Sequence, residues 1–262
     1  MSYANSDMMG FDARFEKLQM IIDHAKKIVF FGGAGVSTES GIPDFRSKDG
    51  LYNVRDVRFE QYEPEYLLSH ECLVEEPKVF FEFYRQKLDT ADIQPNAAHY
   101  KLAELEAAGK ITCIATQNID GLHQKAGSKK VAELHGTTLR NYCMRCGKEV
   151  PERFIFESED EIPRCPHCGG MIRPDVTLYG ESLPTDAWNM AIYAIHEADV
   201  MIIGGTSLTV YPAASLIDYF RGNSLIVINR DRTPRDNYAD LVFHESIGEV
   251  LSRIQVDGGN EK

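Results

Sequence analysis

The sequence predicts an α/β fold in which a doubly wound parallel sheet is joined to a smaller module. Three observations lead to this expectation. Short apolar runs alternate with segments of helical periodicity along most of the chain. A glycine-rich turn follows the first apolar run, and two C-x-x-C pairs interrupt the alternation further on. The chain has 262 residues, 43% of them hydrophobic, which is enough to bury a core of this kind.

The alternation of elements can be followed from the N-terminus. Apolar side chains recur at helical spacing over residues 11–25, and the continuous apolar run Ile28–Phe31 predicts a strand buried on both faces. A helix over residues 96–108 leads into a second strand in ITCIAT. Two more strands are predicted in VMIIGG and SLIVIN, with a helical stretch over residues 211–221 between them.

Two stretches do not fit this alternation and predict a second, smaller domain. Residues 48–95 contain charged turns and one aromatic-rich helical piece, and residues 137–175 contain the paired cysteines among prolines and glycines. We therefore expect a Rossmann-like domain formed by residues 1–47, 96–136 and 176–262. The helical insertion and the zinc-ribbon insertion would together form the small domain.

Composition limits the classes of partner and compartment. The net charge is −12 and no run of five or more lysines or arginines is present, which argues against direct nucleic-acid binding. No apolar stretch is long enough to span a membrane, and six cysteines, four of them in C-x-x-C pairs, are typical of a reducing compartment. We expect a cytoplasmic protein without membrane contact, and a monomer.

The paired cysteines have the spacing of a metal site. Cys143 and Cys146 form one pair, and 18 intervening residues separate it from the pair formed by Cys165 and Cys168. This pattern is typical of a tetrahedral four-thiolate zinc site, with redox-active dithiols as the alternative. Four thiolates complete the coordination shell, so the zinc would be structural. His135, which precedes the first pair, is not needed as a ligand.

The glycine-rich turn indicates a nucleotide phosphate site. Gly33 and Gly35 form a G-x-G pair, but Thr38 occupies the place of the third glycine of the usual fingerprint, so the motif alone is weak. Small residues let the backbone approach a pyrophosphate, and Arg46 offers a bidentate donor for phosphate oxygens. Phe45 beside it could shield a reactive sugar from water.

Polar side chains are also expected at the ends of two predicted strands. Asn229 ends SLIVIN, at the point where such folds hold the adenosine ribose. TQNIDGLH ends another strand with Thr116, Gln117, Asn118 and Asp120, which should face the crevice of an open sheet. An Asx-type turn is the alternative interpretation of this second stretch.

Taken together, these motifs resemble the sirtuins, which are NAD-dependent protein lysine deacylases. The resemblance is carried by GAGVSTESGIPDFRS, TQNIDGLH, the Leu134-His135-Gly136 triplet, the paired C-x-x-C, GTSLTVYPA and Ile228-Asn229, which follow the family's order over residues 28–250. It implies NAD as co-substrate, one structural zinc per chain and acylated lysine-containing proteins as partners.

The resemblance also implies roles for individual residues. His135 would be the general base that acts on the ribose hydroxyls, and Asn118 a second catalytic residue. The nicotinamide would lie near Ile42, Asn118, Ile119 and Asp120. The residues implied for NAD binding are Gly33, Ala34, Gly35, Thr38, Asp44, Phe45, Arg46, Gln117, Asn118, Ile119, Asp120, Gly204, Thr206, Ser207, Asn229, Asp231 and Ile247. Those implied for the substrate, which would add as a strand between residues 180–182 and 209–211, are Thr177, Tyr179, Gly180, Glu181 and Val210.

The acyl channel departs from the family pattern. PDVTLYGE places Thr177 and Tyr179 where deacetylases usually have valine and phenylalanine. Members that remove succinyl or malonyl groups carry Tyr-x-x-Arg, and this chain has Tyr84-x-x-Lys87. Because lysine lacks the planar guanidinium fork, acetyl is expected over acidic acyl groups. The rival functions are a protein mono-ADP-ribosyltransferase and a non-enzymatic NAD or redox sensor.

Overall fold

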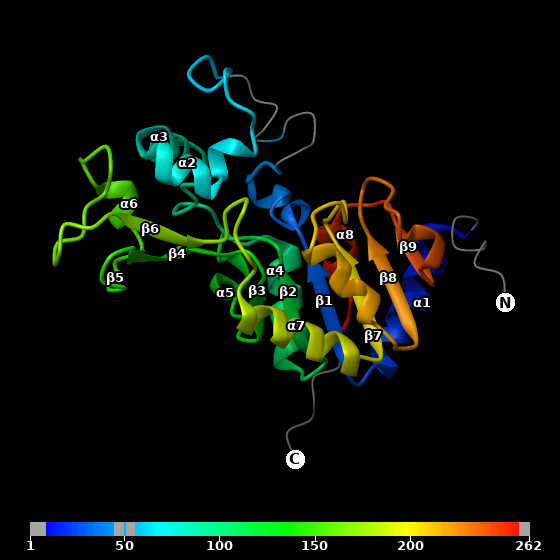
Figure 1. Cartoon of the computed structure of the whole chain (residues 1–262). Helices are drawn as coiled ribbons and strands as arrows, with labels where there is room; N and C mark the ends of the chain where they lie inside the picture. The colour runs from blue at the N-terminus through cyan, green and yellow to red at the C-terminus, as the bar shows by residue number, and fades with distance from the viewer. Residues whose placement is uncertain (1–8, 45–49, 51–55, 257–262) are drawn as a thin grey trace.

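A six-stranded parallel sheet forms the larger part of the computed structural model, which describes residues 9–44, 50 and 56–256 (Figure 1). The strand order, from one edge to the other, is β3 (Val131–Glu133), β2 (Ile111–Thr116), β1 (Ile28–Gly32), β7 (Val200–Gly204), β8 (Ser224–Ile228) and β9 (Leu241–Phe243). The chain builds outward from β1 to one edge and then from β7 to the other. The doubly wound sheet expected from the sequence is therefore confirmed, with its topological switch point between β1 and β7.

The apolar run of β1 forms a central strand because side chains alternate between two cores. Ile28 and Phe30 belong to the core on one face, and Val29 and Phe31 belong to the core on the other, all four with no exposed surface. A strand buried on both faces has no polar position, which explains why it is a continuous apolar run in the sequence.

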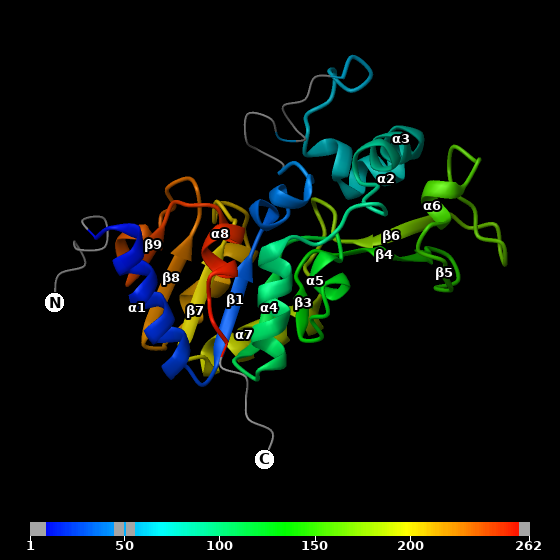
Figure 2. The ribbon, with the colours of Figure 1, turned by 180° about the vertical axis from the view of Figure 1, so that it is seen from behind.

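Helices cover both faces of the parallel sheet. One face is covered by α1 (Phe11–His24), α4 (Ala97–Ala107) and α8 (Ile247–Ser252), which Figure 2 shows in front of the strands. The other is covered by α7 (Thr185–Glu197) and by η4 (Ala213–Tyr219), whereas the short helix α5 (Leu122–Lys125) packs against α4. The helical stretch predicted over 211–221 is thus a 3₁₀ helix. Periods of 3.0 and 3.6 residues are hard to distinguish over a seven-residue segment.

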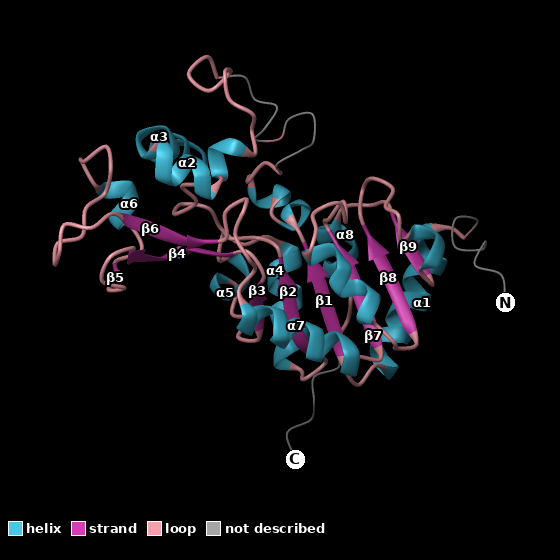
Figure 3. Cartoon of the chain, viewed as in Figure 1, coloured by secondary structure: helices cyan, strands magenta, loops and turns pink. Residues whose placement is uncertain are grey.

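A second, antiparallel sheet lies in a smaller module beside the parallel sheet (Figure 3). Its strand order is β5 (Glu149–Val150), β4 (Gly136–Cys143) and β6 (Ile172–Val176). Helical segments pack against it: η3 (Tyr66–Leu68), α2 (His70–Glu75), α3 (Pro77–Lys87) and α6 (Phe154–Glu157). Residues from both predicted insertions therefore share one core, while the domain boundaries themselves stay a prediction. Within the described ranges, no helix combines the length and the apolar character that a membrane span requires.

Candidate functional site

A cavity of about 540 Å³ lies at the carboxyl ends of the parallel strands. Its walls come from the turn after β1, the segment after β2, the segment after β6 and the loops after β7 and β8. Both sheets therefore contribute to one cavity, at the place where an open α/β sheet binds its ligand. A smaller cavity of about 40 Å³ shares Ala34, Asn118 and Ile119 with it.

The glycine turn after β1 is held against the turn after β7 by close backbone packing. Gly35 donates its N–H to the carbonyl of Gly205 at 2.8 Å, and a Cβ on Gly35 would lie 2.8 Å from the Gly205 Cα. A larger residue would force the two turns apart. Two short 3₁₀ helices, η1 (Ala34–Val36) and η2 (Thr38–Ser40), follow where the usual fingerprint has a long helix. Thr38 donates its hydroxyl hydrogen to the Gly35 carbonyl, which holds the turn without a third glycine.

A chain of hydrogen bonds connects the polar residues behind the glycine turn. Asn118 donates its amide to the Ser37 hydroxyl at 3.0 Å, and Ser37 donates in turn to the Asp120 carboxylate at 2.6 Å. Burial raises the pKa of Asp120, while the hydrogen bonds from Ser37 and from the Leu122 N–H oppose that rise. Ser37 was not among the predicted site residues, although it lies inside the GAGVS motif and could have been found there.

The Asx-type turn after β2 is also present. The Asp120 carboxylate accepts the Leu122 N–H at 2.9 Å, and the Thr116 hydroxyl accepts the Asn118 N–H at 3.0 Å. These bonds order the segment so that Gln117, Asn118 and Ile119 face the large cavity. The two interpretations of this stretch are therefore compatible, since the turn is what points its side chains inward.

His135 lies between the two sheets and faces the large cavity. It follows β3, and the next residue begins β4. Its Nδ1 is 3.0 Å from the Gln117 carbonyl oxygen, which can only accept, so we assign the proton to Nδ1. The Nε2 atom of that tautomer carries a lone pair and can accept a proton.

The backbone around His135 joins β4 closely to β6. Gly136 has φ +72°, and a Cβ there would lie 2.0 Å from the Asp175 carbonyl oxygen. The His135 carbonyl accepts the Thr177 N–H at 2.8 Å. His135 is therefore fixed on one side by the segment after β2 and on the other by the segment after β6.

The predicted NAD residues fall into three groups. Two of them do not line the large cavity: Gly204 ends β7, and Asp120 lines the smaller cavity together with Ile42, Asn118 and Ile119. Phe45 and Arg46 lie outside the described residues. The remaining residues line the large cavity: Gly33, Ala34, Gly35, Thr38, Asp44, Gln117, Asn118, Ile119, Thr206, Ser207, Asn229, Asp231 and Ile247.

The predicted substrate residues all line the large cavity, namely Thr177, Tyr179, Gly180, Glu181 and Val210. Arg230, Arg232 and Glu245 also line it and were not predicted, because no motif marked them. Tyr84 and Lys87 are not brought together: Tyr84 is buried in the core of the small module, whereas Lys87 lines the smaller cavity. The candidate carboxylate-binding pair is therefore not formed in this structure.

The four predicted metal ligands converge. Their sulfur atoms all lie within 4.8 Å of one another, with 3.5 Å between Cys143 and Cys168 and 3.8 Å between Cys146 and Cys165. Zinc bound to four thiolates at about 2.3 Å separates the sulfur atoms by about 3.8 Å, so the arrangement fits a tetrahedral zinc. His135 is not part of this cluster.

Each cysteine pair lies on a turn of the same design. Gly147 follows the first pair with φ +69° and donates its N–H to the Cys143 carbonyl, and Gly169 follows the second with φ +71° and donates to the Cys165 carbonyl. Positive φ at glycine lets the chain fold back, so that both thiols of a pair point to one side. These two turns explain why the C-x-x-C-G pattern occurs twice.

Comparisons with known proteins identify the family. A family model described as the Sir2 family matches residues 33–212. The chain belongs to the Sir2 family. An NAD-dependent protein deacetylase of Clostridium acetobutylicum is 54% identical over 241 residues, which cover 92% of this chain and 98% of that protein.

Solved Sir2 structures resemble the whole described architecture. A complex of a Sir2 homologue with NAD superposes with a TM-score of 0.80 at 38% identity, covering 91% of each chain. A Sir2 protein bound to an acetylated peptide also gives a TM-score of 0.80, at 34% identity, covering 92% of this chain and 96% of the other. The resemblance to the sirtuins drawn from the sequence is confirmed.

Proposed function

We propose that this Sir2 protein removes acetyl groups from lysine side chains of proteins and uses NAD as co-substrate. The observation that carries the proposal is the position of His135. Its Nδ1 is held by the Gln117 carbonyl, and its ring faces a cavity that also contains the glycine turn and the segment after β6. A base is thus placed between the residues proposed for NAD and those proposed for the acyl-lysine.

The proposed reaction transfers the acyl group to ADP-ribose. The carbonyl oxygen of the acyl-lysine attacks C1′ of the nicotinamide ribose, and nicotinamide leaves. His135 Nε2 accepts a proton from the ribose hydroxyls, which lets the 2′-oxygen attack the carbon of the resulting amidate. Asn118, held by Ser37, lies next to the smaller cavity proposed for the nicotinamide. The bond between the acyl carbon and the lysine nitrogen then breaks, and one water molecule adds to the acyl carbon. The products are nicotinamide, O-acyl-ADP-ribose and free lysine.

The four thiolates have a structural role in this proposal. A zinc ion bound to Cys143, Cys146, Cys165 and Cys168 has a complete shell, so it offers no position for water and takes no part in the chemistry. We also propose that the protein acts in the cytoplasm as a monomer. The cytoplasmic location is supported by its cysteines, none of which forms a disulfide in the described structure.

Mass spectrometry of an acetyl-lysine peptide, with NAD present or withheld, tests the function. We expect NAD-dependent loss of acetyl with formation of O-acetyl-ADP-ribose. His135→Ala should lower the rate on the order of 100- to 10,000-fold, as expected for loss of a general base, while zinc content and thermal stability stay unchanged. His196→Ala, at an exposed histidine of α7 outside both cavities, is the matched control and should keep full activity.

Two outcomes would favour the rival functions. Transfer of ADP-ribose to protein, with nicotinamide release that does not depend on an acyl peptide, would indicate a mono-ADP-ribosyltransferase. A sensor would be indicated if the protein binds NAD but turns over no acetyl, longer acyl or acidic acyl peptide. His135→Ala would then behave like the wild-type protein. Turnover of a succinyl peptide in preference to an acetyl peptide would overturn the proposed acyl group alone.

A further inference from the structure

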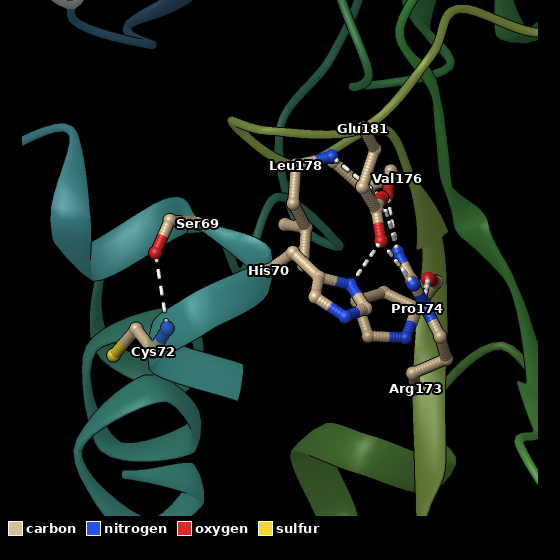
Figure 4. Close-up of polar contacts among 8 residues, drawn as sticks. All are labelled: Ser69, His70, Cys72, Arg173, Pro174, Val176, Leu178 and Glu181. Carbon is tan, nitrogen blue, oxygen red and sulfur yellow. Dashed lines mark hydrogen bonds and ion pairs between the residues drawn. The ribbon is translucent and has the colours of Figure 1, made fainter. Parts of the chain in front are cut away.

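An ion pair between the buried Arg173 and the partly exposed Glu181 adjoins the segment proposed for the acyl-lysine (Figure 4). Arg173, on β6, is only 7% exposed and makes a bidentate contact with Glu181, at 2.6 Å from Nη1 and 2.9 Å from Nη2. The same guanidinium donates to the carbonyls of Val176 at 2.8 Å and Pro174 at 3.2 Å. Arg173 thus bonds to both ends of the segment that follows β6.

The Glu181 carboxylate is fully engaged within the protein. Besides the two bonds from Arg173, it accepts the Leu178 N–H at 3.0 Å and lies 2.8 Å from His70 Nδ1. Burial raises the pKa of Glu181, but the hydrogen bonds from Arg173, from the Leu178 N–H and from His70 outweigh it and lower the pKa to about 2. The group is therefore an anion whose acceptor positions are taken by the protein itself.

His70 brings a third segment into this contact. It is the first residue of α2, and Ser69 caps that helix by accepting the Cys72 N–H at 3.0 Å (Figure 4). The His70 N–H donates to the Tyr179 carbonyl at 2.9 Å, and the Tyr179 N–H donates to the Leu68 carbonyl at 3.0 Å. The segment after β6 is thereby bonded to the helical part of the small module through both backbone and side chains.

The two edges of this segment face different parts of the site. One edge is bonded to His135, through the Thr177 N–H, and the other edge is bonded to α2 and to η3 before it. Thr177 and Tyr179, which make these bonds, and the neighbouring Gly180 line the large cavity. A shift of Glu181 would move the walls of the acyl channel relative to the proposed base.

We propose that Arg173, Glu181 and His70 are positioning residues that hold residues 177–180 between His135 and the helical part of the small module, and so set the affinity for the acyl peptide. This inference rests on the proposed deacylase function. It differs from direct recognition, in which the Glu181 carboxylate would bind a basic side chain of the peptide. Direct recognition would require Glu181 to give up bonds to Arg173, His70 or Leu178.

Substitutions at His70 test the inference without disturbing the ion pair of Arg173 with Glu181. His70→Ala should raise the Kd and the KM for an acetyl-lysine peptide about fivefold, as expected for one partly exposed charge-assisted hydrogen bond. The KM for NAD and the midpoint of thermal unfolding should not change. His70→Asn, whose amide nitrogen occupies nearly the place of Nδ1, should restore most of the affinity. Lys78→Ala, which breaks an exposed ion pair with Glu161 elsewhere in the module, is the matched control and should have no effect.

Glu181→Gln extends the test to the centre of the contact. The amide keeps an acceptor but loses the charge, so the peptide Kd should rise about tenfold or more. The rise should be the same for peptides with lysine or with alanine beside the acetyl-lysine. A loss confined to basic peptides would show direct recognition and overturn the inference.

The measurements separate this inference from the proposed function. Peptide binding is measured by titration calorimetry and turnover by mass spectrometry on the same preparations. If the wild-type protein binds the peptide and both His70→Ala and Glu181→Gln bind it equally well, the inference is overturned while the proposed function stands. A wild-type protein that neither binds nor turns over any acyl peptide would overturn the proposed function and the inference with it.

Discussion

Strands β1 and β7 of the parallel sheet are buried at every position, whereas β5 of the antiparallel sheet has two residues and buries neither. The parallel sheet is enclosed by apolar cores on both faces. The antiparallel sheet shares one core with the aromatic face of α3. The module that contains this sheet also contains the four thiols that fit a zinc ion. Burial of apolar surface thus stabilises both sheets, and the smaller module has a candidate metal site as an additional source of stability.

This difference explains where the proposed site lies. The parallel sheet supplies a rigid frame for the glycine turn and for the segment after β2. The small module supplies the segment after β6, which has one backbone bond to His135, one to η3 and one to α2. Because the module contributes a wall of the cavity, loss of its metal should affect peptide binding before it affects the parallel sheet.

Removal of one zinc ligand should have the largest effect. It should unfold the small module while the parallel sheet stays folded. Cys143→Ser is expected to abolish stoichiometric zinc and deacetylation together, because the binding free energy of a structural zinc, on the order of 10 kcal/mol, is also folding free energy. Hydrogen exchange should show lost protection in β4 and β6 and retained protection in β1, β2 and β7.

Cys113→Ala is the matched control for this loss. Cys113 is a buried thiol of β2 outside the metal cluster, so the variant should keep zinc and activity. Full activity of Cys143→Ser without zinc would contradict a structural role for the metal. Global loss of protection in that variant would show that the two sheets unfold as one unit.

The fold was predictable where one principle determined the local sequence. The buried strands β1, β2, β7 and β8 have continuous apolar runs, and α4 begins at a capping asparagine, Asn96, so all were found from the sequence. β3 and β9 have three residues each and were not predicted, because so short a run carries no period. The 3₁₀ character of η4 was missed for the same reason.

The site was predictable where motifs require a particular residue type. The G-x-G turn, the cysteine pairs and the polar segment after β2 each have a physical need that leaves a pattern in the sequence. The ion pair of Arg173 with Glu181, and the contact of Glu181 with His70, left no such pattern, since His70 and Glu181 are 111 residues apart. Long-range contacts of single side chains depend on the fold and cannot be found from local spacing.

Acid should destabilise the parallel-sheet part through two buried histidines. The rings of His99 and His123 lie 4.8 Å apart. Burial lowers the pKa of His99 to about 4, and burial together with the neighbouring His99 lowers the pKa of His123 to about 3. Histidines of the unfolded chain titrate at about pH 6.5, so below that pH the unfolded state binds protons that the native state does not. The free energy of unfolding should therefore fall as pH decreases from about 6.5 to about 4.

The slope of the free energy of unfolding against pH shows which groups cause this acid sensitivity. Each histidine contributes about 1.4 kcal/mol per pH unit within that window. His123→Leu should reduce the slope by about this amount. The change in packing that the substitution causes does not depend on pH, so it does not alter the slope. No described residue hydrogen-bonds to either ring nitrogen of His123. Guanidinium unfolding at pH 7, 6 and 5 measures the slope. An unchanged slope would place the acid sensitivity elsewhere, for example in protonation of the zinc thiolates.

The smallest effect is expected at Tyr84, in the aromatic core of the small module. Tyr84 is fully buried and stacks on Phe80 and Phe156, and no described residue hydrogen-bonds to its hydroxyl. Tyr84→Phe removes a buried polar atom without a partner, so the free energy of unfolding should stay the same or rise by about 1 kcal/mol. The ratio of acetyl to succinyl turnover should also stay the same, because Tyr84 does not line the cavity.

Tyr179→Phe is the matched control at a cavity-lining tyrosine and should change that ratio with little effect on stability. A lower stability of Tyr84→Phe would show that its hydroxyl has a partner, and a shifted ratio would show that it reaches the acyl group after all.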